Sequence, residues 1–151
     1  IQRLIGRSLR SCIDLKKIPD TTIVLDCDVI QADGGTRTTA INGCVVALIL
    51  ALQQRQYQKK LTEDPILHLI TAVSLGLIDN EVRLDLDYEE DSKAQVDSNI
   101  VLSEHGDIIE IQATAERDPL AHDQLMSMLR IAQQQQSVLL EAMRQACGLT
   151  T

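Results

Sequence analysis

A glycine-rich turn at residues 33–37, Asp-Gly-Gly-Thr-Arg, joins two stretches of opposite character. Residues 21–30 are rich in β-branched side chains and predict a strand, whereas residues 38–56 are apolar on almost every side and predict a central, buried helix. A strand that turns into a helix through two glycines leaves backbone N–H groups free at the start of the helix. An anion fits there, because the helix dipole adds partial positive charge.

Two side chains of this turn are suited to a phosphate ion. Thr36 offers a hydroxyl group, and Arg37 offers a planar guanidinium that can bind two oxygens of one anion. By spacing alone, however, two adjacent glycines more often mark a tight turn with a capping threonine. The phosphate interpretation therefore depends on the rest of the chain.

The composition limits the kinds of protein that this chain can be. Its 151 residues suit one domain with a sizeable core, and 44% of them are hydrophobic. Phe and Trp are absent and only two tyrosines are aromatic, so the core must be aliphatic and an aromatic stacking platform for RNA is nearly excluded. The longest apolar run, residues 43–52, is too short to span a bilayer, and we expect no membrane partner.

Charge is spread unevenly along the chain. The net charge of −8 argues against binding nucleic acid with the whole surface. Residues 1–17 nevertheless carry five basic residues and one acidic residue, whereas residues 81–110 carry ten acidic and two basic residues. Most of these carboxylates are expected to be solvated, but an acidic block beside a phosphate site is also what a cation-dependent phosphoryl-transfer enzyme needs.

The cysteines indicate a reducing compartment. All four are scattered, without a Cys-x-x-Cys pair, and Cys12, Cys27 and Cys44 lie in apolar runs that predict buried thiols. We therefore expect a cytoplasmic protein. A zinc site is not expected, because the cysteines and the three histidines form no cluster.

Periodicity along the chain predicts an α+β fold class, with helices packed against a mixed β-sheet. A polar loop is expected over residues 89–96, and the last helix should stop at Gly148, a residue suited to a helix C-terminus. The predicted helices cover residues 1–14, 38–56 and 123–147, and the predicted strands cover residues 21–30, 69–77, 81–88, 99–102 and 108–113.

Four segments stand out along the chain: IQRLIGRSLR (1–10), CDVIQADGGTRT (27–38), DYEEDS with DSN (87–92 and 97–99) and IEIQATAE (109–116). They resemble, in the same order, segments of ribonuclease PH, a family of phosphate-dependent 3′→5′ exoribonucleases that trim tRNA precursors. The resemblance implies the fold of ribosomal protein S5 domain 2. It also implies one domain over residues 1–151, with the tail of a first half over 1–61, a second half over 62–151, and the N-terminal part of the fold missing.

The resemblance also assigns roles to particular residues. It implies that inorganic phosphate, a co-substrate, lies on Gly35, Thr36 and Arg37, and that Asp91 and Asp97 hold Mg²⁺. Arg37 and the two aspartates would then be the catalytic residues. By spacing alone, two aspartates in an acidic stretch are more often ordinary surface residues, so their assignment comes from the resemblance.

The family also implies partners. These are RNA, specifically the 3′ end of a tRNA precursor, and further copies of the chain in a hexameric ring built as a trimer of dimers. Arg3 and Arg7 could contact the RNA backbone, or they could belong to a solvated or salt-bridged helix face. Two alternatives stay open: a non-catalytic, exosome-like ring subunit that binds RNA or only builds the ring, and an interaction domain whose Gly-Gly turn is only a turn.

Some positions depart from the family pattern. Ala113 and Arg117 stand where the family usually has glycines, and Ala121 stands where it usually has a helix-capping serine or threonine. These changes affect the loop before the last helix. Asn99, in contrast, matches ribonuclease PH, since the related domain of polynucleotide phosphorylase has a lysine there.

Overall fold

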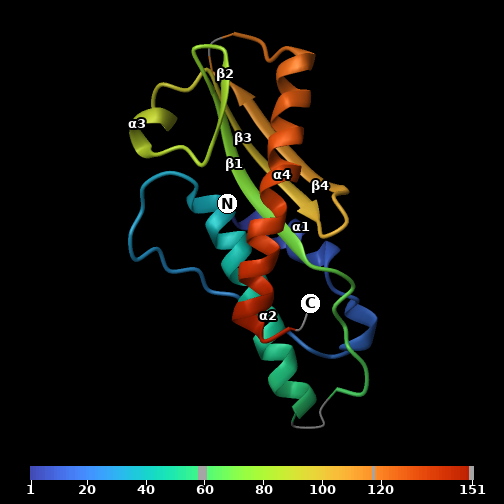
Figure 1. Ribbon diagram of the computed structural model, residues 1–151. Helices are drawn as coiled ribbons and strands as arrows, with labels where there is room; N and C mark the ends of the chain where they lie inside the picture. The colour runs from blue at the N-terminus through green and yellow to red at the C-terminus, as the bar shows by residue number, and fades with distance from the viewer. Residues whose placement is uncertain (58–60, 117, 150–151) are drawn as a thin grey trace.

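The computed structural model describes residues 1–57, 61–116 and 118–149 (Figure 1). It confirms the α+β class: helices pack on both faces of one four-stranded sheet. The elements are α1 (Gln2–Ser11), a 3₁₀ turn (Leu15–Lys17), α2 (Thr36–Tyr57), β1 (Ile70–Ile78), β2 (Glu81–Leu84), α3 (Tyr88–Asp91), β3 (Val96–Ser103), β4 (Ile108–Ala115) and α4 (His122–Cys147).

The sheet has the strand order β2-β1-β3-β4 and is antiparallel at every pairing. The sequence analysis predicted a mixed sheet, and that prediction is wrong. Asp79 and Asn80, both with positive φ (50° and 64°), form the tight turn between β1 and β2. Such turns match the twist of the flanking strands and bring them into register.

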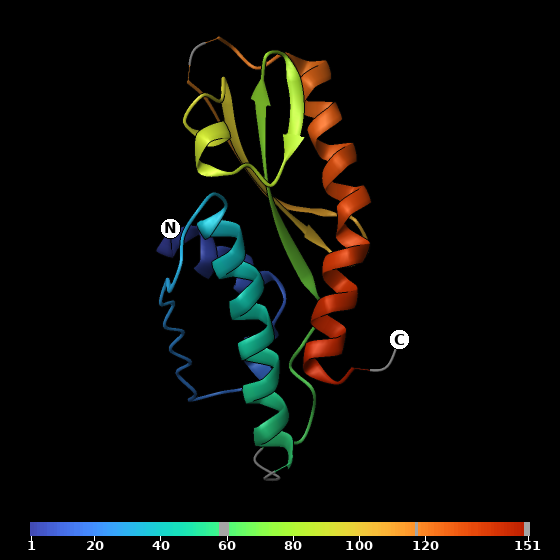
Figure 2. The same ribbon diagram turned by 60° about the vertical axis from the view of Figure 1, so that its left-hand side comes forward.

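Successive side chains of β1 and β3 point to opposite faces of the sheet, so the sheet separates two apolar layers. One layer lies under α4, which runs along the sheet and continues beside α2 (Figure 2). The other lies under α1 and α2. The α4 layer includes Val73, Leu75, Leu77, Val96, Ile100, Leu102, Met128 and Ala132, and the opposite layer includes Leu4, Leu9, Ile41, Val45, Leu48, Ile70, Ala72 and Val101.

Helix α2 is buried on one side only. Its inward side contacts β1, α1 and α4, whereas Gly43, Ala47 and Leu50 lie on the other, less covered side. The prediction of a helix buried on nearly all sides is therefore only partly right. By length and composition, Thr36–Gln56 could cross a membrane, but core helices of other proteins share this property, and these contacts bury its inward side.

Residues 21–30 form an extended segment and not the predicted strand. Figure 2 shows this segment running beside α2, away from the sheet. A strand needs a hydrogen-bonded neighbour, and no strand pairing among the described residues includes residues 21–30. For the same reason Val24, Ile30 and Cys27 are exposed, which contradicts the prediction of a buried Cys27 thiol.

Another correction concerns the segment after β2. Strand β2 ends at Leu84 and not at residue 88, and part of the predicted polar loop is the short helix α3. Asp87 begins this helix, because its side chain accepts a hydrogen bond from the backbone N–H of Glu90 at 2.8 Å. A single capping carboxylate thus decides the local structure that carries Asp91.

Candidate phosphate and metal site

The turn at residues 33–37 packs directly on the chain that follows β2. A Cβ atom on Gly34 would lie 1.6 Å from the carbonyl oxygen of Leu86, so only glycine allows this approach. Gly35 has a φ of 65°, and its carbonyl oxygen accepts a hydrogen bond from the Thr39 backbone N–H at 3.0 Å. Helix α2 therefore begins immediately after Gly35, and the N–H groups of its first turn have no partner within the helix. The predicted anion site would use these groups together with the Thr36 hydroxyl.

A hydrogen bond joins this turn to α3. Oδ1 of Asp33 accepts from the backbone N–H of Tyr88, with 2.7 Å between the two atoms. Because α3 ends at Asp91, the segment with the predicted phosphate residues and the segment with a predicted metal ligand are attached to each other.

Arg37 and Asp97 form an ion pair, although 60 residues separate them in the sequence. Arg37 comes from the first turn of α2, and Asp97 comes from the beginning of β3, opposite Gly76 in the register with β1. Their side chains are 34% and 20% exposed, so the pair is partly shielded from water. The structure thus brings a predicted phosphate-binding residue into contact with a predicted metal ligand.

Asp91 and Asp97 line one polar pocket of about 390 Å³, and Glu116 completes its acidic wall. Mg²⁺ commonly takes one or two protein carboxylates and keeps its waters, so the chemistry of this wall fits that ion. Within residues 1–57, 61–116 and 118–149, no group of three or more His, Cys, Asp or Glu side chains is close enough to hold a metal jointly. Glu116 was not predicted as a site residue, since only the end of β4 brings it to this pocket.

Asn99 lies on the same face of β3 as Asp97, two residues further along. It is 2% exposed, and its Nδ2 atom has no hydrogen-bond partner among the residues that the structure describes. In the sheet register it stands opposite Ser74 on β1 and Gln112 on β4. The Nδ2 donor of this buried amide is thus not used by the described part of the fold.

The two predicted RNA-binding arginines differ. Arg7 forms a two-pronged ion pair with Glu110 of β4, with 3.0 Å between Nε and Oε2, although 54% of its side chain is exposed. Arg3 is exposed on the same helix. Of the alternatives that the sequence left open for Arg7, the structure therefore shows the salt-bridged helix face.

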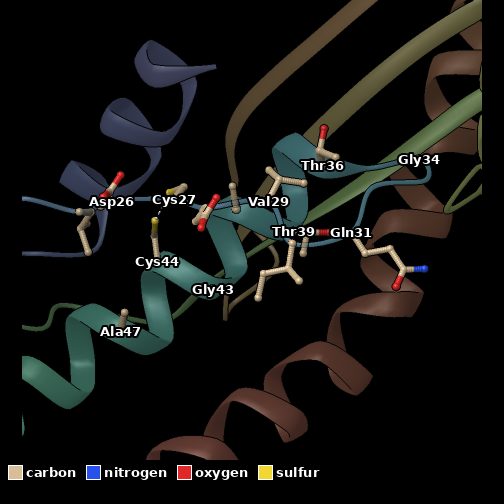
Figure 3. Close-up of a pocket in the computed structure, with 14 residues that line it drawn as sticks. Asp26, Cys27, Val29, Gln31, Gly34, Thr36, Thr39, Gly43, Cys44 and Ala47 are labelled. Atoms are coloured by element: carbon tan, nitrogen blue, oxygen red, sulfur yellow. Dashed lines mark hydrogen bonds between the residues drawn. The ribbon is translucent and has the colours of Figure 1, made fainter.

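A second, more apolar cavity of about 520 Å³ lies between residues 25–31 and α2 (Figure 3). Small residues of the helix, among them Gly43 and Ala47, form one wall. Cys27 and Cys44 both line this cavity, and their sulfur atoms point toward each other, 3.2 Å apart. Burial raises the pKa of Cys44 to about 12, and the contact with Cys27 contributes, so this thiol is protonated at neutral pH. The sequence did not predict this cavity.

The departures near α4 have small structural effects where the structure describes them. Ala121 cannot cap the helix with its own side chain, and Gln124 reaches back instead, accepting from the Ala121 backbone N–H at 3.0 Å. Ala113 lies within β4 opposite Ser98. Arg117 lies outside the described residues.

Comparison with known proteins agrees with this fold. The model of the 3′ exoribonuclease family, domain 1, matches residues 1–53, and the model of domain 2 matches residues 68–135. The crystal structure of rice (Oryza sativa) Rrp46 is similar with a TM-score of 0.75 and 22% sequence identity, over 97% of this chain and 63% of that chain. The structural likeness shows the fold, and the chain spans less than two thirds of the length of that relative. The two domain matches confirm the resemblance at the level of the family, and the chain belongs to the 3′ exoribonuclease family.

Proposed function

We propose that this protein is a phosphate-dependent 3′→5′ exoribonuclease that releases nucleoside diphosphates and trims the 3′ end of tRNA precursors. One observation carries the proposal: Arg37, in the first turn of α2, contacts Asp97, which lines the acidic pocket. The reaction needs a phosphate site and a cation site side by side. The family membership supports the same reaction class.

The residues divide the chemistry between them. The free N–H groups of α2, the Thr36 hydroxyl and the Arg37 guanidinium would hold inorganic phosphate as the nucleophile. A phosphate oxygen attacks the phosphorus of the last phosphodiester, and the bond from this phosphorus to the 3′ oxygen of the preceding nucleotide breaks. The products are a nucleoside diphosphate and an RNA one nucleotide shorter with a free 3′ hydroxyl.

Asp91 and Asp97 are the residues that would hold Mg²⁺ in this proposal. When bound, the ion would offset negative charge that gathers on the transferred phosphoryl group. Glu116, on the same wall, is available to hold a water of the ion or to repel a misplaced phosphate. Because no covalent intermediate is required, most of the catalysis comes from positioning.

The partners follow from the same proposal. Arg3 and Arg7 would contact the RNA backbone, and a hexameric ring, built as a trimer of dimers, would supply further RNA-binding surface. A cytoplasmic location accords with the reduced thiols that the function does not use.

A second candidate is an exosome-like ring subunit that binds RNA or only builds the ring. The two ion pairs favour it, because Arg37 and Arg7 are both neutralised by carboxylates in this structure. A non-catalytic subunit could keep such pairs permanently, whereas an enzyme must open the first pair during its cycle.

An RNA degradation assay separates the two candidates. The protein is incubated with an RNA that has an unstructured 3′ end, with Mg²⁺, and with or without inorganic phosphate. The enzyme should shorten the RNA only when phosphate is present. Arg37→Ala should lose this activity and keep its circular dichroism spectrum. RNA that stays intact in a properly assembled sample would instead favour the ring subunit.

A further inference from the structure

We propose that the Arg37–Asp97 ion pair makes inorganic phosphate and Mg²⁺ bind cooperatively, each ligand releasing the residue that the other requires. This inference rests on the proposed function, because it takes Arg37 as the phosphate ligand and Asp97 as the metal ligand. It concerns how that same site is regulated.

The ion pair occupies both groups that the ligands need: phosphate needs Arg37, and the cation needs Asp97. The Arg37 guanidinium donates to Oδ2 of Asp97, so part of its hydrogen-bonding capacity is already used by an internal anion. A phosphate at the start of α2 has to displace this carboxylate. A cation that approaches Asp97 has to displace the guanidinium.

Each displacement has a cost that only the first ligand bears. The two side chains are 34% and 20% exposed, so leaving either charge unpaired is more costly than for a fully solvated pair. Once Mg²⁺ neutralises Asp97, Arg37 is free for phosphate. Once phosphate neutralises Arg37, Asp97 is free for the cation, and by linkage the two effects must be equal in size.

Asp91 provides a built-in comparison. It lines the same acidic pocket as Asp97 and carries the same charge, yet no ion pair among the described residues joins it to Arg37. If repulsion between carboxylates and phosphate were the whole cause of weak phosphate binding, removing either charge would have a similar effect. If the ion pair is the cause, only Asp97 matters.

The first measurement is calorimetric titration of inorganic phosphate into the protein, in EDTA and then in Mg²⁺. Free concentrations are corrected for the magnesium phosphate complex in solution. We expect Mg²⁺ to lower the Kd of phosphate about fivefold or more, and phosphate to lower the Kd of Mg²⁺ by the same factor. Equal phosphate Kd values with and without Mg²⁺ would overturn the inference.

Matched variants identify the cause. In EDTA, Asp97→Asn should bind phosphate more tightly than the wild type by about the same fivefold factor, whereas Asp91→Asn should stay within about twofold. Glu104→Gln is the control, because it opens an ion pair far from the site. Glu104 lies just beyond the opposite end of β3 and pairs with Arg144 at 2.8 Å; the two side chains are 22% and 29% exposed. This variant should leave phosphate binding unchanged. Equal gains in Asp91→Asn and Asp97→Asn would show general electrostatics and overturn the inference.

A spectroscopic measurement keeps the test decisive if Asp97→Asn folds poorly. The Arg37 Nε–H signal of the wild-type protein is followed by NMR while Mg²⁺ alone is added. It should move as the guanidinium is released, while the Arg144 signal stays in place. An Arg37 signal that does not respond to saturating Mg²⁺ would overturn the inference. The absence of saturable phosphate binding in every variant would instead overturn the phosphate site itself, and the inference with it.

Discussion

Asp33 accepts a hydrogen bond from the backbone N–H of Tyr88, with 2.7 Å between Oδ1 and N, and thereby fastens the glycine turn to α3. We predict that Asp33→Ala lowers the free energy of unfolding by about 0.5–1.5 kcal/mol, because one hydrogen bond is lost. The same change should weaken Mg²⁺ binding, because α3 ends at Asp91, a predicted metal ligand. Asp33→Asn keeps an acceptor oxygen and should have a smaller effect on both. Urea unfolding and Mg²⁺ titration of the two variants provide the measurement, and equal losses would contradict the role of this hydrogen bond.

The two glycines of the turn should differ in their tolerance of a methyl group. Gly34→Ala places Cβ against the Leu86 carbonyl oxygen, so the turn must shift, at a cost of about 1–3 kcal/mol and with loss of phosphate binding. In Gly35→Ala, Cβ meets no atom closer than 3.5 Å, and the cost is the left-handed backbone, about 1–2 kcal/mol.

Gly6 is the matched control for these substitutions. It lies within α1, and a Cβ atom added there would meet no neighbouring atom within 4 Å, so Gly6→Ala should stabilise the protein by about 0.5–1 kcal/mol. Thermal unfolding with and without phosphate ranks the three variants. If Gly34→Ala kept wild-type stability and phosphate binding, the close packing of the turn on Leu86 would be wrong.

Alkaline pH should destabilise the protein through Cys12. This thiol is 1% exposed, and burial raises its pKa from 9.0 to about 11. The folded state holds the proton more tightly than the unfolded chain, so the stabilising contribution is complete below pH 9 and is lost as the pH rises toward 11. In Cys12→Ala the free energy of unfolding should fall less steeply over this window than in the wild type. Parallel slopes would contradict the buried, protonated thiol.

Each arginine on the basic face of α1 should contribute separately to RNA binding. Arg3→Ala and Arg7→Ala should each weaken RNA binding and reduce the slope of log K against log salt by about 0.7–1. Arg7→Ala should leave the stability of the fold almost unchanged, because the Arg7 side chain is 54% exposed and surface ion pairs contribute little. Titration of labelled RNA at several salt concentrations tests this, and unchanged slopes would place RNA elsewhere.

Elements with a strong local pattern could be predicted from the sequence. Helix α4 and strands β1 and β4 lie close to their predicted ranges, because each carries a clear apolar pattern, whereas β3 begins at Val96, three residues before the predicted strand over 99–102. The segment 21–30 has the composition of a strand, but composition cannot supply the neighbour that a strand needs. Helix α3 has four residues and depends on one capping side chain, Asp87, which periodicity does not reveal.

The candidate site was predicted residue by residue, but its arrangement was not. A motif indicates that Arg37 suits phosphate and Asp97 suits a cation, yet their contact depends on the register of β3 with β1 and on where α2 begins. Glu116 enters the pocket for the same reason, through the pairing of β4 with β3. Long-range pairing of this kind is set by packing over the whole sheet.

Transfer of label from inorganic [³²P]phosphate into nucleoside diphosphate tests the central claim most directly. The protein is incubated with unlabelled RNA, Mg²⁺ and labelled phosphate, and the nucleotides are separated by chromatography. Our account predicts label in the β-phosphate of nucleoside diphosphates, lost in Arg37→Ala and in Asp97→Asn. Unlabelled nucleoside monophosphates would show hydrolysis in place of phosphorolysis, and the absence of any released nucleotide would show a non-catalytic protein; either result would contradict the account.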